Sequence, residues 1–229
     1  MARSRFSRLP RSRQDEILRL AAVEFAKHGF EGTSYNALLE RLKLGKSSAY
    51  YYFEDKRDLF LTTVARSYER FFERLAELPE PRDKKAFWAY CEQSARLGFE
   101  FMLEDQTAAD LMQCFQRERA LSSELLSYEV LHGMSEFYGR LARLGRRLGA
   151  LSKDMPETLQ FRLLENVVVT FDQWFVEVSR SADFPGTDAC AELLVDTLRR
   201  LAGTGPSARE STRRFARPVR KRARARAAR

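Results

Sequence analysis

The chain has 229 residues, 44% of them apolar, which is enough for one large or two modest domains with a buried core. No apolar run approaches the length of a membrane span, and the first residues carry charges where a signal peptide needs an apolar segment. The three cysteines are far apart, and neither they nor the two histidines show metal-ligand spacing. We therefore expect a cytoplasmic protein with reduced thiols, no membrane contact, no metal and no cofactor.

The net charge of +8 is concentrated at the two ends of the chain. Residues 1–13 hold five Arg and no acid, and residues 206–229 hold ten Arg or Lys against Glu210 alone. These ends carry +5 and +9, so residues 14–205 sum to −6. Cationic ends of this kind are usually disordered and bind polyanions, most often nucleic acid. A tail that only keeps the protein in solution is the plainer alternative.

The N-terminal part of the chain shows helical periodicity in four successive segments. The first segment ends at Gly29, and a second helix follows the capping residue Ser34. A short third helix begins at Lys46, and a fourth runs over residues 56–75 behind the capping residue Asp55.

Five more amphipathic segments follow, and none shows the alternation of a β-strand. They span about residues 83–103, 106–117, 121–149, 156–181 and 187–202. From Gly203 on, Arg alternates with Ala without apolar periodicity, which predicts disorder. The sequence thus predicts an all-α fold of about nine helices.

The stretch GKSSAYYYFEDK, residues 45–56, places three tyrosines on the predicted third helix. A Walker phosphate-binding loop is excluded because Glu40 stands where its first glycine is required. Two short helices joined by a tight turn form a helix-turn-helix, whose second helix needs an apolar back and a small or polar front. Ala49 and Phe53 supply the back. The front consists of Lys46, Ser47, Ser48 and Tyr51, flanked by Tyr50 and Tyr52.

Residues 13–60 resemble the TetR family of transcriptional regulators. The matching positions are Ala22, Phe25, Gly29, Thr33, Ser34, Leu38, Lys46, Tyr50, Phe53, Lys56 and Leu59. The resemblance implies an all-helical homodimer whose first three helices bind an operator in double-stranded DNA. It also implies a C-terminal domain that binds a small molecule and dimerises, and repression as the family's default.

The family's pattern implies DNA contacts from nine residues of this sequence. The base-reading positions are Lys46, Ser47, Ser48 and Tyr51, and the phosphate-facing positions are Ser34, Tyr35, Tyr50, Tyr52 and Lys56. Two residues depart from the pattern. Lys43 stands where the turn commonly has Gly, so it is expected to adopt a left-handed conformation. Gly45 replaces a frequent capping Ser, which weakens that cap.

Residues 163–178 are apolar almost all round, which is typical of a helix buried on both sides. Together with residues 187–202, this helix from each subunit would form a four-helix interface, the place where TetR-like proteins dimerise. A monomeric core is the alternative. The residues expected in the interface are Leu163, Val167, Phe171, Trp174, Leu194 and Leu198.

The segments between residues 83 and 149 combine many aromatic and Met side chains with scattered polar groups. This mixture favours a pocket for a small hydrophobic or aromatic effector, although plain core packing is the commoner role of any single residue. The candidate ligand residues are Trp88, Phe99, Met112, Phe115, His132 and Phe137.

The sequence thus predicts a sequence-specific, ligand-responsive repressor that binds a palindromic operator as a homodimer. Its expected parts are a basic arm at 1–13, a DNA-binding domain at 14–60 with the helix-turn-helix at about 34–53, an effector-binding and dimerisation domain at 61–203, and a disordered basic tail at 204–229. A general nucleoid-associated protein that binds DNA through its basic tail is the alternative. An enzyme has no support, because no nucleophile motif or metal cluster is present in the sequence.

Overall fold

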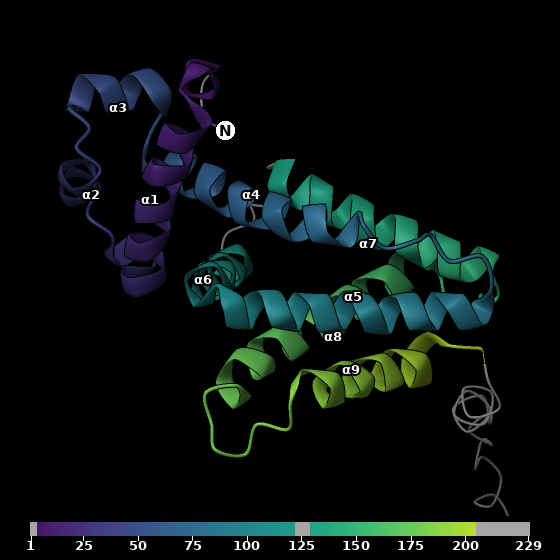
Figure 1. The fold of residues 1–229 in the computed structure, drawn as a ribbon. Helices are drawn as coiled ribbons and strands as arrows, with labels where there is room; N and C mark the ends of the chain where they lie inside the picture. The colour runs from purple at the N-terminus through teal and green to yellow at the C-terminus, as the bar shows by residue number, and fades with distance from the viewer. Residues whose placement is uncertain (1–3, 122–128, 205–229) are drawn as a thin grey trace, which may run out of the picture.

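The computed structural model describes residues 4–121 and 129–204, with side chains outside 119–135, and these residues are almost entirely helical (Figure 1). A short 3-10 helix, η1, spans Phe6–Arg8. The α-helices are α1 (Arg11–Gly32), α2 (Tyr35–Arg41), α3 (Lys46–Tyr52), α4 (Lys56–Leu75), α5 (Lys84–Glu104), α6 (Gln106–Leu121), α7 (Glu129–Arg147), α8 (Glu157–Val178) and α9 (Thr187–Ala202). The predicted all-α class is confirmed, since extended pairing within the described ranges amounts to one bridge between Leu151 and Gly203.

Most helix boundaries lie at the start and stop signals of the sequence. Gly29 adopts a φ of 72° and interrupts α1 before its last turn. Asp55 and Asp83 cap α4 and α5, each accepting a hydrogen bond of 2.8 Å from the backbone N–H three residues on. Ser34 makes no such side-chain bond at the start of α2. The helix expected at 121–149 ends earlier, because Gly149 has a φ of 69°.

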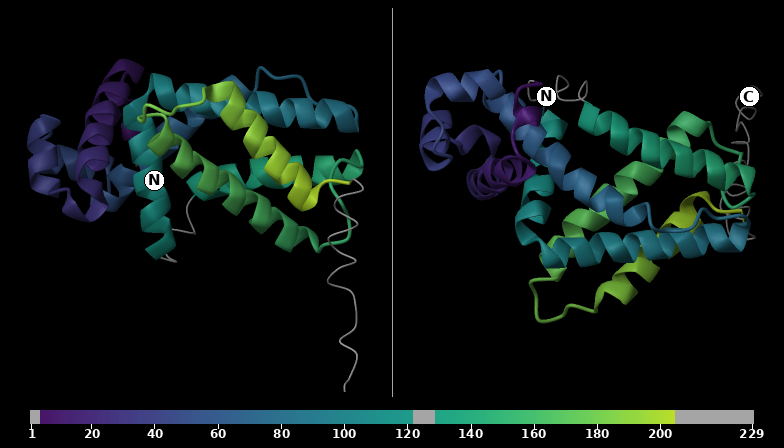
Figure 2. Two further views of the ribbon diagram at one scale, coloured as in Figure 1. Left: turned by 90° about the horizontal axis from the view of Figure 1, so that it is seen from below. Right: turned by 45° about the horizontal axis from the view of Figure 1, so that its top comes forward.

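Helices α1, α2 and α3 form one end of the molecule, and α4 leads from them into a bundle made by α5 to α9 (Figures 1 and 2). Helix α1 packs against both α4 and α6. The ring of Phe60 on α4 lies 4.9 Å from Phe25 on α1 and 6.3 Å from Phe115 on α6, and all three are fully buried. The expected domain boundary at residue 60 therefore runs through a continuous apolar core, which couples the two parts mechanically.

The end of α9 is fixed at the side of the molecule opposite α3 (Figures 1 and 2). Ser152 N donates to Ala202 O at 2.7 Å, and Thr204 N donates to Ala150 O at 3.0 Å. Lys84 Nζ also donates to Thr204 O at 2.6 Å. The expected basic tail lies outside the described residues beyond Thr204, so the tail begins far from the helix-turn-helix.

Two further expectations concern membranes and thiols. Among the described helices, none combines the length and apolar character needed to cross a bilayer. Cys91, Cys114 and Cys190 form no disulfide, and burial raises the pKa of each thiol, that of Cys91 to about 12. Thiols with raised pKa values are poor nucleophiles, so these residues act as apolar packing groups.

Candidate nucleic-acid interface and internal cavity

Helix α3 buries one face and exposes the other, as the sequence predicts. Ala49 and Phe53 have no exposed surface and pack into the core shared with α1, α2 and α4. The exposed side chains are Lys46, Ser47, Ser48, Tyr50 and Tyr51. Tyr50 and Tyr51 are 52% and 47% exposed, a large amount of ring surface for so short a helix. A polar front with protruding rings on a rigidly packed back is the shape that enters a major groove.

The turn between α2 and α3 has the strained residue that the sequence predicts. Lys43 has a φ of 52°, the only positive value among the described residues other than glycine. Its N–H donates to Glu40 O at 3.1 Å, and the next N–H, that of Leu44, donates to Leu39 O at 3.0 Å. Gly45 then precedes α3 without a side-chain cap bond. The left-handed residue lets the chain turn sharply within four residues, so that α3 runs across the direction of α2 (Figure 1).

The N-terminal segment is folded against α3 from residue 4 onward, where the charge pattern suggested a disordered arm. Phe6 is 3% exposed, and its ring lies 4.8 Å from Phe53 and 6.1 Å from Tyr52. The guanidinium of Arg5 lies 4.3 Å from the ring centre of Tyr51. One buried aromatic ring contributes about 2–3 kcal/mol, enough to fix a short segment that is otherwise cationic. The segment adds a positive charge beside the exposed face of α3.

Tyr35 supports the exposed face rather than forming part of it. Its ring contacts Tyr50 edge-on at 6.2 Å. Its hydroxyl is buried and has no hydrogen-bond partner in the described structure, and burial raises its pKa to about 12. The neighbouring Ser34 is exposed at the start of α2. A buried hydroxyl is badly placed for a phosphate, so Tyr35 acts here by holding Tyr50.

Lys56 links α4 to the end of α1. Its ammonium donates to Phe30 O at 2.8 Å and to Thr33 O at 3.2 Å, and it lies 4.4 Å from the ring centre of Phe30. The family's pattern predicts that Lys56 contacts a DNA phosphate. In the structure the charge is used inside the protein, because the carbonyls of Phe30, in the last turn of α1, and of Thr33, its C-cap, lie at a helix end and need donors.

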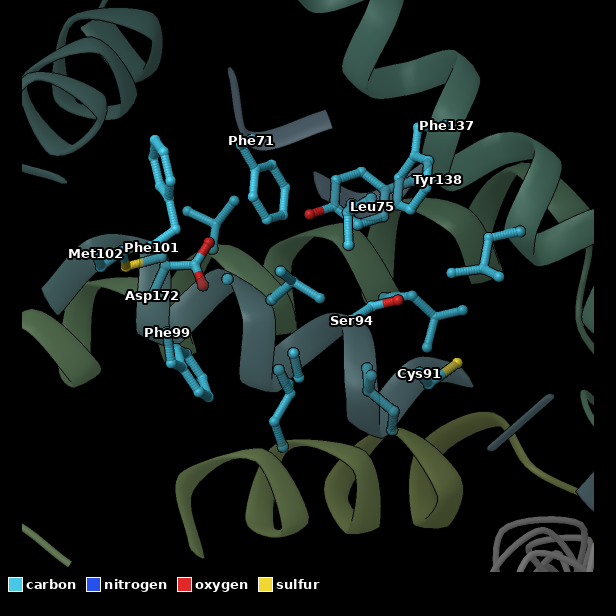
Figure 3. Close-up of a pocket in the computed structure, with 18 of the residues that line it drawn as sticks. Phe71, Leu75, Cys91, Ser94, Phe99, Phe101, Met102, Phe137, Tyr138 and Asp172 are labelled. Carbon is cyan, nitrogen blue, oxygen red and sulfur yellow. The ribbon is translucent and has the colours of Figure 1, made fainter. Parts of the chain in front are cut away.

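An internal cavity lies within the bundle and is bordered by every helix from α4 to α9 (Figure 3). Its empty space is about 1370 Å³, including the part open to solvent. The wall is mainly aromatic and aliphatic, which is typical of small-molecule sites. Four of the expected ligand residues line it, namely Trp88, Phe99, Met112 and Phe137.

Two expected ligand residues are not among the described lining. Phe115 is fully buried on the neighbouring stripe of α6, with its ring 6.4 Å from Tyr68. That stripe points toward α1, whereas Met112 and Gln116 point into the cavity. His132 belongs to α7, but its side chain lies outside the described residues. A high aromatic content in the sequence indicates that α6 lines a cavity. It does not show which of two neighbouring faces of the helix does so.

The polar groups of the cavity include a carboxyl that the sequence analysis did not single out. Asp172 on α8 borders the cavity, and desolvation raises its pKa from 3.8 to about 7. Tyr138 on α7 also borders it, and burial, followed by the nearby Asp172, raises the pKa of its phenol well above 10.0. Asp172 escaped notice because α8 also carries Glu157, Glu165 and Glu177, and the sequence alone does not show which of these acids faces a cavity.

The residues expected in a subunit interface do not share one outer face. Leu194 is 4% exposed and packs inside the chain, and Leu198 borders the cavity. Val167, Phe171 and Trp174 are partly buried against the same core, and Leu163 is partly exposed. The outward-facing leucines of α8 and α9 are Leu159, Leu193 and Leu201, at 48%, 51% and 40% exposure. The exposed leucines of α9 thus begin one residue before the row, Leu194 and Leu198, that the sequence predicts for the interface.

The comparisons with known proteins agree with this architecture. Residues 17–63 match the family model described as bacterial regulatory proteins of the tetR family. Comparison with curated protein sequences gives no match. Among solved structures, a TetR family transcriptional regulator from Chloroflexus aurantiacus J-10-FL has a TM-score of 0.61 at 22% identity, covering 90% of this chain and 100% of that one.

Two further structures are similar in fold. FadR from Bacillus subtilis, in complex with stearoyl-CoA, has a TM-score of 0.62 at 16% identity and covers 80% of this chain and 96% of its own. SmeT, the repressor of the multidrug efflux pump SmeDEF of Stenotrophomonas maltophilia, has a TM-score of 0.63 at 18% identity and covers 88% and 94%. The N-terminal domain therefore matches the TetR family of bacterial regulatory proteins, and the fold of the chain is similar to that of solved TetR family transcriptional regulators.

Proposed function

We propose that the protein is a ligand-responsive repressor that binds a palindromic operator as a homodimer in the cytoplasm. The observation that carries the proposal is the exposed face of α3, where Lys46, Ser47, Ser48 and Tyr51 stand on a fully buried back. Side chains of these types hydrogen-bond to base edges and contact thymine methyl groups. Tyr50 and Tyr52 flank them for the phosphates, with Ser34 at the start of α2.

The dimer is proposed to form through the outer face of α8 and α9. Leu193 and Leu201 are two turns apart on α9, and Leu159 is exposed on α8. Two copies of this helix pair would bury these leucines in a four-helix contact. A two-fold dimer presents two copies of α3, and two related half-sites on DNA form a palindrome.

The effector is proposed to act through α4 and α6. Both helices border the cavity with one face and pack against α1 with another. A ligand that displaces either helix therefore moves the core that positions α3, because a close-packed interior transmits displacement. FadR holds stearoyl-CoA and SmeT is a repressor, and both support this reading by similarity of fold alone.

Competition between DNAs tests the proposal against a general DNA-binding function through the basic tail. The protein is bound to a labelled fragment from upstream of its own gene, and unlabelled random DNA is added in excess. We expect the labelled complex to survive, since specific sites exceed nonspecific ones by about 10³-fold or more. Displacement of the labelled fragment by this excess of random DNA would favour the nucleoid-associated alternative.

A further inference from the structure

We propose that the effector is an amphipathic cation, an apolar molecule with one positively charged nitrogen that pairs with Asp172. The inference rests on the proposed function, in which the cavity is the effector site. The evidence for the chemical class of the effector is the carboxyl of Asp172 and the aromatic rings around it.

Asp172 is the one charged side chain among the described residues that line the cavity. Figure 3 shows its carboxyl pointing into the space that Phe71, Phe101 and Met102 border. Within the described part of the chain, this carboxyl forms neither a hydrogen bond nor an ion pair. A carboxyl that is partly buried in an apolar wall without a partner is costly to ionise, and the raised pKa of Asp172 reflects this desolvation. A cationic ligand would remove the cost.

Aromatic rings around Asp172 suit the same ligand. Phe71 and Phe101 lie 5.9 Å apart at their ring centres, on α4 and α5, and both border the cavity. Tyr138 faces the same space from α7 (Figure 3). Ring faces attract ammonium groups, and a carboxylate combined with several rings forms a site for a substituted ammonium.

The cavity has a polar end and an apolar end. Around Asp172, polar groups come from α4, α6 and α7, including Tyr68, Gln116 and Tyr138. Phe87, Trp88 and Leu151 belong to a separate core cluster, against which Cys91 and Leu198 pack, and Figure 3 shows Cys91 at the other side of the cavity from Asp172. A ligand with a charged head and an apolar body matches both ends, with its head beside the helices that pack on α1.

An anionic ligand finds no counter-charge on this wall. No Lys or Arg occurs among the described lining residues, and two of the three lining amides, those of Gln113 and Gln116, already donate one hydrogen bond each. Gln113 Nε2 donates to Gln173 O at 3.4 Å, and Gln116 Nε2 donates to the Tyr68 hydroxyl at 3.3 Å. A fatty acid or an acyl-CoA phosphate would therefore lose its hydration beside Asp172 without gaining a cationic partner from the described lining. The effector class differs in this respect from the stearoyl-CoA held by FadR.

Binding of such a cation should depend on pH. The titratable side chains that face the cavity are Tyr68 on α4, Cys91 on α5, Tyr138 on α7 and Asp172 on α8, and the described parts of α6 and α9 add none. Only Asp172 is a carboxylic acid. A fixed cation favours its ionised form, so affinity should rise with pH as the carboxyl of the empty cavity loses its proton near pH 7.

The experiment compares three probes with one decyl chain: decyltrimethylammonium, decanol and decanoate, each below its micellar concentration. Calorimetric titration of the full-length protein at about pH 8 should give the cation about tenfold or more tighter binding than decanol, and decanoate the weakest. Asp172→Asn should lower the affinity for the cation about tenfold and leave decanol unchanged, because Asn keeps the shape and removes the charge. Asp183→Asn, the same change on the exposed α8–α9 loop, should alter neither.

Each other result counts against the inference in a distinct way. If decanol or decanoate binds as tightly as the cation, or if Asp172→Asn binds the cation unchanged, the cavity takes ligands but the cationic class is wrong. If none of the probes binds, the cavity is not an effector site of this kind, and the proposed function loses its ligand response as well. A cation affinity that stays flat between about pH 6 and pH 8 would also overturn the role of Asp172.

Discussion

Replacing Lys56 with Ala distinguishes a structural lysine from a DNA-contacting one. The substitution removes two hydrogen bonds, at 2.8 and 3.2 Å, from a charged donor to backbone carbonyls of Phe30 and Thr33. Bonds to charged groups contribute about 1.5–3 kcal/mol when partly buried. The ammonium above the Phe30 ring adds about 0.5–1 kcal/mol. Because one ammonium makes all these contacts, we expect a total loss of about 2–3 kcal/mol, which lowers the Tm by about 5–10 °C in a chain of this size.

The assay is thermal unfolding followed by circular dichroism, together with DNA affinity measured well below the Tm. Lys46→Ala is the matched control, since Lys46 is exposed on α3 and should change DNA affinity with little effect on the Tm. If Lys56→Ala unfolds at the wild-type temperature but binds all DNA sequences more weakly, the charge contacts phosphate and the structural role is refuted.

Four more outcomes are expected. Tyr51→Ala should weaken operator binding by about 1–3 kcal/mol and relax base preference, and equal losses on operator and random DNA would contradict base reading. Leu193→Glu should give a folded monomer in analytical ultracentrifugation, because Leu193 is 51% exposed in the single chain; a persistent dimer would place the interface elsewhere. Asp172 keeps its proton to about pH 7 when folded but to about pH 4 when unfolded, so the stability of the wild type should fall as pH rises across this range. Asp172→Asn should remove that fall, which amounts to at most about 4 kcal/mol by pH 8, and parallel melting curves in both proteins would disprove it. Deleting residues 205–229 should flatten the dependence of DNA affinity on salt by about 0.9 per lost phosphate contact, whereas an unchanged slope would mean that the tail does not touch DNA.

Local signals were sufficient to predict most helix boundaries. Asp55 caps α4 and Gly29 interrupts α1, each for a reason visible within a few residues of sequence, whereas the left-handed conformation of Lys43 followed from the resemblance to the family's turn. The two faces of α3 were also predictable, because a short helix that buries Ala49 and Phe53 leaves few choices for the other positions.

Features that depend on packing between distant segments were not predictable. Phe6 sits among five arginines, and only the assembled α3 shows what its ring packs against. Leu194 and Leu193 are neighbours in an apolar helix, and their burial is decided by where α5 and α8 lie. Lys56 matched a DNA-contact position, but the carbonyls of Phe30 and Thr33 at the end of α1 accept hydrogen bonds from it. In each case the sequence periodicity predicts that the segment is helical. Which of its side chains are buried depends on the segments that pack against it.

Selection of DNA from a random pool by the purified wild-type protein, followed by sequencing, tests the central claim that α3 reads bases from a two-fold dimer. The account predicts an enriched palindrome whose half-site centres are about 10 base pairs, or a multiple of that, apart. Repeating the selection with Tyr51→Ala should blur the bases within each half-site and keep the spacing, because the dimer is unchanged. If the wild-type protein enriches no sequence, or enriches a single asymmetric site, the account is contradicted. It is also contradicted if Tyr51→Ala selects the same bases as the wild type.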